Sequence, residues 1–247
     1  IQQAEKTDKP FYVNVWPDDV HSPFDPPTEL RGDGSKHALY NGVVVNMDRQ
    51  LAPLFDYVRS SEKLRNNTLI IVASDNGPEP GAGSAGVFRG AKGTLYEGGI
   101  REPLITWGPG LIPADKKGSV DSTTVLSSID LMPSLLRVAG VNVPPAAKPD
   151  GRDRSAALLG REKSPPATKP IFWKRPPDRP GPPRNRFPDL AVRDGNWKLL
   201  VDEDGSAPQL YDLAKDPGEA RNIAAANTAV VERLKKAVLA WNSTLPK

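Results

Sequence analysis

Three side chains at the ends of apolar runs have the chemistry to act on an anion or a metal ion. His21 lies in a loop rich in proline and aspartate, and Asp75 and Asn76 directly follow the apolar run 69–73. Asp75 offers a carboxylate and Asn76 an amide carbonyl, which are hard oxygen donors of the kind that calcium and magnesium prefer. The same Asp-Asn-Gly sequence is also typical of a simple turn, so local sequence leaves both interpretations open.

A glycine-rich stretch at 81–99 surrounds a single lysine, Lys92. Small residues let a backbone approach an anion closely, and a lysine ammonium is a compact positive charge for a tetrahedral oxyanion. A flexible surface loop with a solvated lysine explains the same pattern. A phosphate loop of the P-loop type is excluded, because the chain has no Gly-Lys-Ser or Gly-Lys-Thr sequence.

An alternation of strands and helices is expected to position these side chains. Composition and periodicity predict strands at 11–16, 69–73 and 104–107 and helices at 37–63 and 127–138. We expect the run 69–73 to be a parallel strand that is covered on both faces. Because ligands of open parallel sheets bind beyond the carboxyl ends of the strands, the sequence predicts an α/β fold in which His21 and Asp75 face one site.

A smaller unit is expected after a proline-rich connection. Twelve of the 27 prolines lie between Pro144 and Pro188. Beyond them, apolar runs at 190–193 and 197–201 flank Asp-Gly-Asn, which indicates a hairpin, and a further strand at 209–213 and a helix at 224–239 are predicted. We therefore predict an α/β domain at 1–145 and, at 146–247, the proline-rich connection with a small antiparallel sheet and a packed helix.

Composition excludes several classes of function. The 33 Lys and Arg residues exceed the 30 Asp and Glu residues too slightly to imply nucleic-acid binding, and we expect none. No run of about 18 apolar residues is present, so a membrane-spanning helix is not expected. The chain has no cysteine, which excludes disulfides, thiolate metal sites and cysteine nucleophiles within it.

Several longer strings carry a more specific signal. RGAKGTLYEGGIREP at 89–103 follows Ser-Asp-Asn-Gly at 74–77 at a fitting distance, and further matching strings lie at 129–134, 192–199 and 210–222. Together they resemble the sulfatase family of the alkaline-phosphatase-like superfamily over nearly all of the chain. The resemblance implies the C-terminal part of an alkaline-phosphatase-like α/β sandwich, followed by a small antiparallel sheet with a packed helix.

The resemblance also implies roles for individual residues. Asp75 and Asn76 would be ligands of a divalent cation, usually calcium. His21 and Lys92 would contact the sulfate group, and the imidazole would protonate the departing alcohol. Glu97 and Arg101 also match family positions, and we interpret them as loop-shaping.

Two further cations are candidates for contact with the rest of the substrate. Lys174 and Arg175 begin a basic, proline-rich run that extends to Arg186. In the family the segment after such a strand tends to return to the rim of the active site, often with histidine where this chain has Lys174. Solvated loop cations explain the same run, since most charge runs are only that.

The nucleophile of the family is not found in this chain. Sulfatases use a formylglycine made from a cysteine or serine that is followed, after one residue, by proline, then serine or alanine, and an arginine. The nearest serine version, at 164–168, lacks the arginine and is rejected. We therefore expect a C-terminal fragment, inactive alone, whose missing N-terminal part carries the nucleophile and the remaining metal ligands.

Three functions fit these observations. Hydrolysis of a carbohydrate or aryl sulfate ester by the complete protein is the main prediction. A phosphodiesterase or phosphonate monoester hydrolase of the same superfamily would share the metal and the fold, and a non-catalytic module that binds sulfated polymers would need no nucleophile. The resemblance also suggests a periplasmic or secreted protein.

Overall fold

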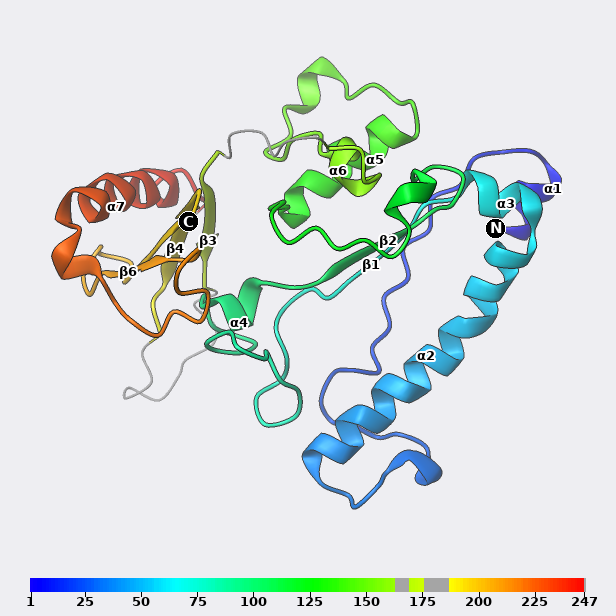
Figure 1. The fold of residues 1–247 in the computed structure, drawn as a ribbon, viewed down its shortest axis with the longest axis horizontal. Coiled ribbons are helices and arrows are strands. Elements are labelled where there is room, and N and C mark those ends of the chain that lie inside the picture. Colours follow the sequence, from blue (N-terminus) through cyan, green and yellow to red (C-terminus); the bar gives the residue numbers. More distant parts are fainter. Residues whose placement is uncertain (163–168, 176–186, 247) are drawn as a thin grey trace. The chain divides into compact units, whose positions relative to one another are not determined.

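The computed structural model describes residues 1–162, 169–175 and 187–246 (Figure 1). It contains two compact units, of which the first consists of Ile1–Val72, Glu79–Gly83 and Ile105–Lys117, and the second of Ala73–Pro78, Ser84–Leu104 and Gly118–Lys247. The rejected serine candidate at 164–168 and the basic run 176–186 lie outside the described residues. The domain boundary predicted at residue 145 stays a prediction.

The first unit is built around the long helix α2 (Lys36–Ser60). The Ser35 side chain accepts a hydrogen bond from the Ala38 N–H at 3.2 Å and so caps the helix start. The predicted helix at 37–63 is confirmed, and α2 continues through Pro53. Its neighbours along the chain are short: α1 (Gln2–Lys6), η1 (Thr28–Leu30) and α3 (Glu62–Asn67). η2 (Ala114–Lys116) also belongs to this unit.

Strands β1 (Ile70–Ala73) and β2 (Leu104–Trp107) form a two-stranded sheet. Both strands were predicted and are confirmed. The expectation that the first would be covered on both faces is wrong, since Val72 is 46% exposed and Ile105 in its partner strand is 60% exposed. In the described part of the chain β1 pairs only with β2, and neither strand contains a fully buried residue.

The predicted strand at 11–16 is also not observed. These residues have no regular secondary structure, and Tyr12 and Trp16 are 70% and 81% exposed. A strand needs a neighbour that accepts and donates its backbone hydrogen bonds. In the regions that the structure describes, no strand pairs with this segment, so its β propensity alone does not make a strand.

The second unit contains a group of short helices and a four-stranded sheet. The helical elements before the sheet are α4 (Glu97–Ile100), η3 (Ser128–Asp130), α5 (Leu131–Val138), η4 (Pro145–Ala147) and α6 (Ser155–Leu158). Ser127 and the buried Asp130 form a reciprocal capping box at η3, which continues into α5. The helix predicted at 127–138 is therefore confirmed.

The sheet has the order β3 (Ile171–Lys174), β4 (Leu190–Asp194), β5 (Trp197–Val201) and β6 (Gln209–Asp212), with every neighbouring pair antiparallel. Asp194 pairs with Trp197, which leaves Gly195 and Asn196 as a two-residue turn. Gly195 has a φ of +60°, as such hairpin turns require. The predicted hairpin and the strand that follows it are confirmed.

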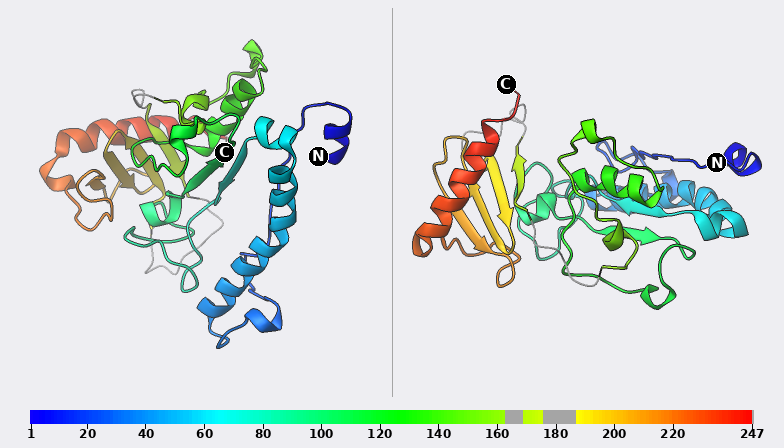
Figure 2. Two further views of the ribbon diagram at one scale, coloured as in Figure 1. Left: turned by 45° about the vertical axis from the view of Figure 1, so that its right-hand side comes forward. Right: turned by 90° about the horizontal axis from the view of Figure 1, so that it is seen from above.

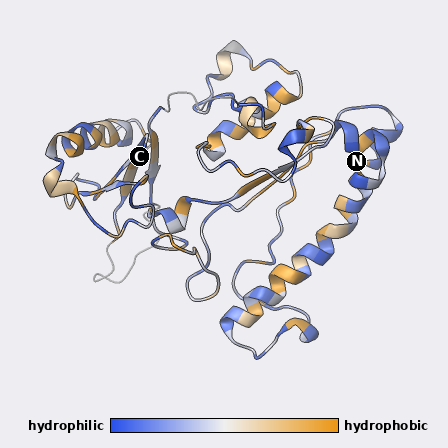
Figure 3. Cartoon of the chain, viewed as in Figure 1, coloured by the Kyte–Doolittle hydropathy of each residue, from blue (hydrophilic) through white to orange (hydrophobic). Residues whose placement is uncertain are grey.

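Each face of this sheet is buried against a different partner. Helix α7 (Thr228–Asn242), which follows η5 (Ala224–Ala226), covers one face, as the ribbon shows from two further directions (Figure 2). Val231, Leu234 and Val238 of α7 pack there, and the helix as a whole carries both hydrophobic and hydrophilic stretches (Figure 3). The opposite face packs against Leu95 and Tyr96. Because side chains alternate along a strand, neighbouring strand residues belong to different cores.

Candidate functional site

Asp75 and Asn76 lie in a turn directly after β1. Asp75 is exposed, Asn76 is half-buried, and the next residue, Gly77, is buried. The Gly77 N–H donates a hydrogen bond to the Gly99 carbonyl oxygen at 3.0 Å, and the Ser74 hydroxyl donates to the Asn76 carbonyl oxygen at 2.8 Å. The turn is therefore held from within and is tied to the end of α4.

Glycines make this region tightly packed. A Cβ atom on Gly77 would lie 2.0 Å from the Gly98 carbonyl oxygen, and one on Gly98 would lie 2.6 Å from the Arg89 carbonyl oxygen. A Cβ atom on Gly99 would lie 2.2 Å from the Thr94 carbonyl oxygen. The glycines thus allow three backbone segments to touch, which no side chain would permit.

Lys92 is half-buried in the same unit. Its backbone N–H donates to the Pro78 carbonyl oxygen at 3.0 Å, so its loop is attached to the segment that carries Asp75 and Asn76. The Thr94 hydroxyl donates to the Ala91 carbonyl oxygen at 2.9 Å and closes the turn around Lys92. Backbone hydrogen bonds therefore bring the predicted oxyanion-binding segment next to the predicted cation-binding segment.

The electrostatics of this region suit an added positive charge. Burial and the negative charge of Asp75 both raise the pKa of Glu102. The oxygen donors of Asp75 and Asn76 fit a hard cation chemically. However, within residues 1–162, 169–175 and 187–246, no group of three or more His, Asp or Glu side chains is arranged to hold a metal ion. The two residues therefore fit part of a ligand shell.

The two histidines belong to the first unit. His21 is exposed, and its Nδ1 lies 2.8 Å from the carbonyl oxygen of Ser22. His37 Nδ1 lies 2.6 Å from the Ala82 carbonyl oxygen, and its Nε2 lies 3.1 Å from Asn41 Nδ2. His37 therefore has a local structural role. His21 and Lys92 are not brought together within one unit.

Lys174 and Arg175 at the end of β3 have partners within the second unit. Lys174 Nζ donates to Glu203 Oε1 at 2.7 Å and to Asn242 Oδ1 at 3.0 Å, beside a cavity of about 400 Å³. The hydrogen bond from Lys174 to Glu203, together with the positive charge of Lys174, lowers the pKa of Glu203. Arg175 forms an ion pair with Asp189 at 3.6 Å. Their proposed contact with substrate stays a prediction.

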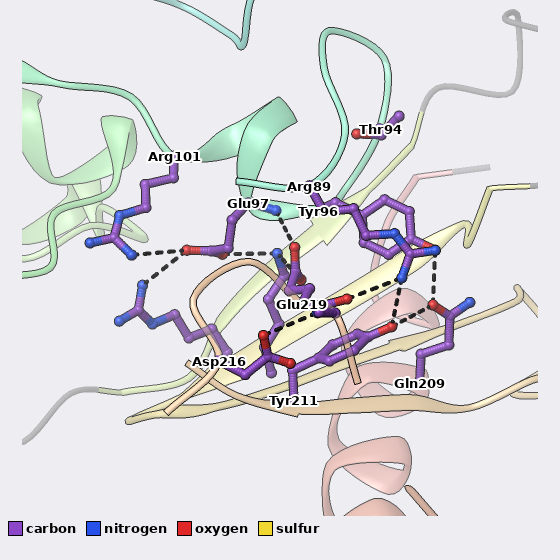
Figure 4. A network of polar contacts seen from close by, with 12 residues as sticks. Arg89, Thr94, Tyr96, Glu97, Arg101, Gln209, Tyr211, Asp216 and Glu219 are labelled. Carbon is purple, nitrogen blue, oxygen red and sulfur yellow. Dashed lines mark hydrogen bonds and ion pairs between the residues drawn. The ribbon is translucent and has the colours of Figure 1, made fainter. Parts of the chain in front are cut away.

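A buried group of charges, of which only Glu97 was singled out from the sequence, as loop-shaping, lies beside α4 (Figure 4). Lys198 is 0% exposed, and its Nζ lies 2.8 Å from Glu97 Oε1 and 2.9 Å from Glu219 Oε1. Glu219 Oε2 also accepts a hydrogen bond from the Glu97 N–H at 2.6 Å. Two carboxylates thus share one buried ammonium group. We call these three residues the buried triad.

Two arginines flank the buried triad. Arg101 and Arg193 approach Glu97 Oε2 at 3.6 and 3.9 Å, which is too far for a direct hydrogen bond. Burial lowers the pKa of Arg193. Burial also raises the pKa of Glu219, which is the second carboxylate of the buried triad. The positive charges of the two arginines thus supplement that of Lys198 at the Glu97 carboxylate.

Arg89 links the loop of Lys92 to strand β6. Its guanidinium lies 4.0 Å from the centre of the Tyr96 ring and donates to the Tyr211 hydroxyl at 3.0 Å and to the Glu219 carbonyl oxygen at 3.2 Å. The hydroxyls of Tyr96 and Tyr211 both donate to Gln209 Oε1 (Figure 4). Burial, as the main cause, raises the pKa of Tyr211 to about 12.

One sequence signal points to the buried triad in retrospect. Lys198 stands in the apolar run Trp-Lys-Leu-Leu-Val, two positions before the buried Leu200. Residues two apart on a strand share a face, so the hairpin prediction already placed this lysine on a buried face. A buried lysine requires a carboxylate partner, but the sequence does not identify which one.

Two family models match the chain. The model described as Sulfatase matches residues 1–141, and the model described as N-sulphoglucosamine sulphohydrolase, C-terminal, matches residues 83–243. Human arylsulfatase A is 31% identical over 96% of this chain and 49% of that protein. The N-acetylgalactosamine-6-O-sulfatase of Bacteroides thetaiotaomicron is 27% identical over 93% of this chain and 46% of that protein. The chain thus spans about half the length of these relatives.

Solved structures agree with the sequence comparisons. The PsFucS1 sulfatase from Pseudoalteromonas sp. has a TM-score of 0.72 and 26% identity, and the likeness covers 98% of this chain and 50% of that one. Ps i-CgsB, also solved in complex with k-i-k-neocarrahexaose, has a TM-score of 0.73 and 25% identity over 90% of this chain and 47% of that one. The predicted α/β fold class is confirmed.

Proposed function

The chain belongs to the sulfatase family with its alkaline-phosphatase-like α/β fold, and we propose that the complete protein hydrolyses carbohydrate or aryl sulfate esters. One observation carries the proposal for this chain's part in the site. The Lys92 N–H is hydrogen-bonded to Pro78, three residues after Asp75, so a cation for the sulfate group and oxygen donors for a metal share one packed region.

Each proposed residue has a distinct task. Lys92 binds the sulfate group and offsets the negative charge that builds up as the sulfur–oxygen bond breaks. His21 contacts the same group and gives a proton to the departing alcohol. Asp75 and Asn76 hold a divalent cation, for which we propose calcium; when bound, that ion supplies further neutralisation of the sulfuryl oxygens.

The remaining parts of the site are proposed to come from sequence outside this chain. The 247 residues include no cysteine and no serine in the expected formylglycine context. Calcium takes roughly 6 to 8 oxygen ligands, which Asp75 and Asn76 do not provide. We propose that a part of the protein outside these 247 residues supplies the nucleophile and further carboxylates.

A location and a substrate class follow from the same proposal. Sulfated carbohydrates and aryl sulfates are the proposed substrates, and the proposed location is periplasmic or secreted, on the family resemblance alone. Among the described residues, no helix is both long and apolar enough to cross a membrane. Ps i-CgsB was solved with an oligosaccharide, which supports a carbohydrate substrate for this protein.

The test is hydrolysis of a small aryl sulfate by the complete protein. Lys92→Ala should lower kcat/KM by about a hundredfold or more, because one preorganised charge is lost at the transition state. Lys235→Ala is the matched control, since Lys235 pairs with Glu232 on the surface of α7. The 247-residue chain alone should show no turnover.

Two other outcomes for the complete protein would favour the alternative functions. Faster hydrolysis of an aryl phosphonate or phosphodiester than of an aryl sulfate would favour the phosphodiesterase alternative. Sulfate binding without any turnover would favour a binding module.

A further inference from the structure

We propose that Lys198 and Glu219 are positioning residues, which hold the loop of Lys92 in place from the C-terminal sheet by fixing Glu97 at the start of α4. The proposal deepens the proposed function, on which the role of Lys92 rests. The geometry of the buried triad does not depend on that function.

The buried triad determines where α4 begins. Glu219 Oε2 accepts from the backbone N–H of Glu97, while Lys198 holds the Glu97 side chain. Backbone and side chain of one residue are thus held by two residues of the C-terminal sheet region. A helix start held at both points has little freedom to shift or rotate.

Helix α4 is in turn hydrogen-bonded to two segments of the proposed site. The Gly98 N–H donates to the Arg89 carbonyl oxygen at 2.7 Å, and the Gly99 carbonyl oxygen accepts from the Gly77 N–H at 3.0 Å. These bonds join α4 to the segment just before Lys92 and to the turn of Asp75 and Asn76. Because the glycine contacts leave no space, movement of α4 would displace both segments.

The backbone of Glu219 adopts a conformation that favours glycine. Its φ is +51°, in the left-handed region, which is unfavourable for a residue other than glycine. The side chain is completely buried, where an unpaired carboxylate is costly. Glycine would relieve the backbone strain but would leave Lys198 with Glu97 alone and the Glu97 N–H without its acceptor. The contacts of the carboxylate offset the strain.

A buried ion pair is better suited to positioning a segment than to adding net stability. Buried ion pairs contribute little net stability compared with apolar residues of similar volume, because desolvation of the charges offsets their attraction. Such pairs have directed contacts that an apolar cluster lacks. Ala191 and Leu200 belong to an apolar cluster on the same side of the sheet, whereas the cross-strand neighbours of Lys198 are Arg193 and Tyr211, so the directed charge contacts are a local feature of the sheet around Lys198.

The experiment uses the complete protein with the variant Glu219→Gln. The matched control is Glu162→Gln, which weakens the buried ion pair with Arg154 at 2.8 Å, outside the α4 contacts. We expect Glu219→Gln to raise the inhibition constant of inorganic sulfate and to lower kcat for a small aryl sulfate, each by about tenfold or more. The control should lose similar thermal stability and leave both constants within about twofold of wild type.

A double-mutant cycle tests whether Glu219 acts through Lys92. In a Lys92→Ala background, Glu219→Gln should no longer change the inhibition constant of sulfate, because the group it positions is absent. Full additivity of the two effects would overturn the proposal, and so would an unchanged sulfate constant in a folded Glu219→Gln protein.

Hydrogen exchange gives a readout that does not need activity. Backbone amides of residues 89–99 should exchange faster in Glu219→Gln than in Glu162→Gln, when each variant is measured the same number of degrees below its own melting temperature. Equal exchange in the two variants would overturn the positioning role even if the complete protein has no sulfatase activity. If Glu219→Gln does not fold, the charge-balanced variant Lys198→Met with Glu219→Gln takes its place, with the same expectations.

Discussion

Lys198 Nζ lies 2.8 Å from Glu97 Oε1, although the two residues are 101 positions apart in the sequence and neither is more than 2% exposed. The pair joins the middle of the C-terminal sheet to the first residue of α4. Its consequences for stability can be measured directly.

Lys198→Met should destabilise the complete protein by about 3–5 kcal/mol, because it leaves the carboxylates of Glu97 and Glu219 buried without their shared ammonium group. Denaturant unfolding measures the change. Lys235→Met, which removes a surface cation paired with Glu232, should cost less than about 1 kcal/mol. Similar losses in the two variants would contradict a buried ion pair at Lys198.

The stability of the protein should depend on pH through Glu219. Burial raises its folded-state pKa above the ordinary value of 4.5, so the folded state retains this proton over a higher pH range than the unfolded state does. The free energy of unfolding should therefore fall as pH rises from 4.5 through the raised pKa. Glu219→Gln should lose this contribution. If the free energy of unfolding depended on pH in the same way in the wild-type protein and in Glu219→Gln, the pKa of Glu219 would not be raised.

Gly77→Ala should disrupt the turn of Asp75 and Asn76, because its Cβ would lie 2.0 Å from the Gly98 carbonyl oxygen. We expect a stability loss of about 1–3 kcal/mol, together with loss of aryl sulfate hydrolysis by the complete protein. Gly34→Ala is the control, since its φ is +78° but no atom lies within 4 Å of the added methyl group. The control should lose some stability and keep its activity.

Calcium should bind only weakly to the 247-residue chain, because Asp75 and Asn76 fall well short of the roughly 6 to 8 ligands that calcium takes. Calorimetry on the chain, with Asp75→Asn as the comparison, measures the affinity. A submicromolar dissociation constant that Asp75→Asn abolishes would show that other residues of this chain complete the site.

Replacing Lys174 and Arg175 by alanine in the complete protein should weaken kcat/KM for a sulfated oligosaccharide by about tenfold and barely affect a small aryl sulfate. Replacing Lys174 alone by Met tests its ion pair with Glu203, because the pKa of Glu203 should then rise toward its ordinary value. Equal losses on both substrates would indicate damaged folding or chemistry. No loss on either would contradict a contact between these cations and the substrate.

The sequence by itself determined the elements whose signals are local. The turn at Gly195, the helix start at Ser35 and the apolar run of β1 each follow from residues within a few positions of one another. The string at 89–103 was specific enough to indicate the family without a structure, and the family models agree. Local signals failed at 11–16, where strand formation depends on a distant partner.

Only the tertiary structure decided which distant groups meet. Nothing in the sequence pairs Lys198 with Glu97 and Glu219, because the partner of a buried charge is set by the packing of the sheet against α4. The glycines of 81–99 likewise suggested an approach to an anion, whereas Gly98 and Gly99 allow backbone segments to touch one another. Periodicity and propensity depend on neighbours along the chain. A buried charge instead needs a partner of opposite charge close to it in space, and folding can bring that partner from about a hundred positions away.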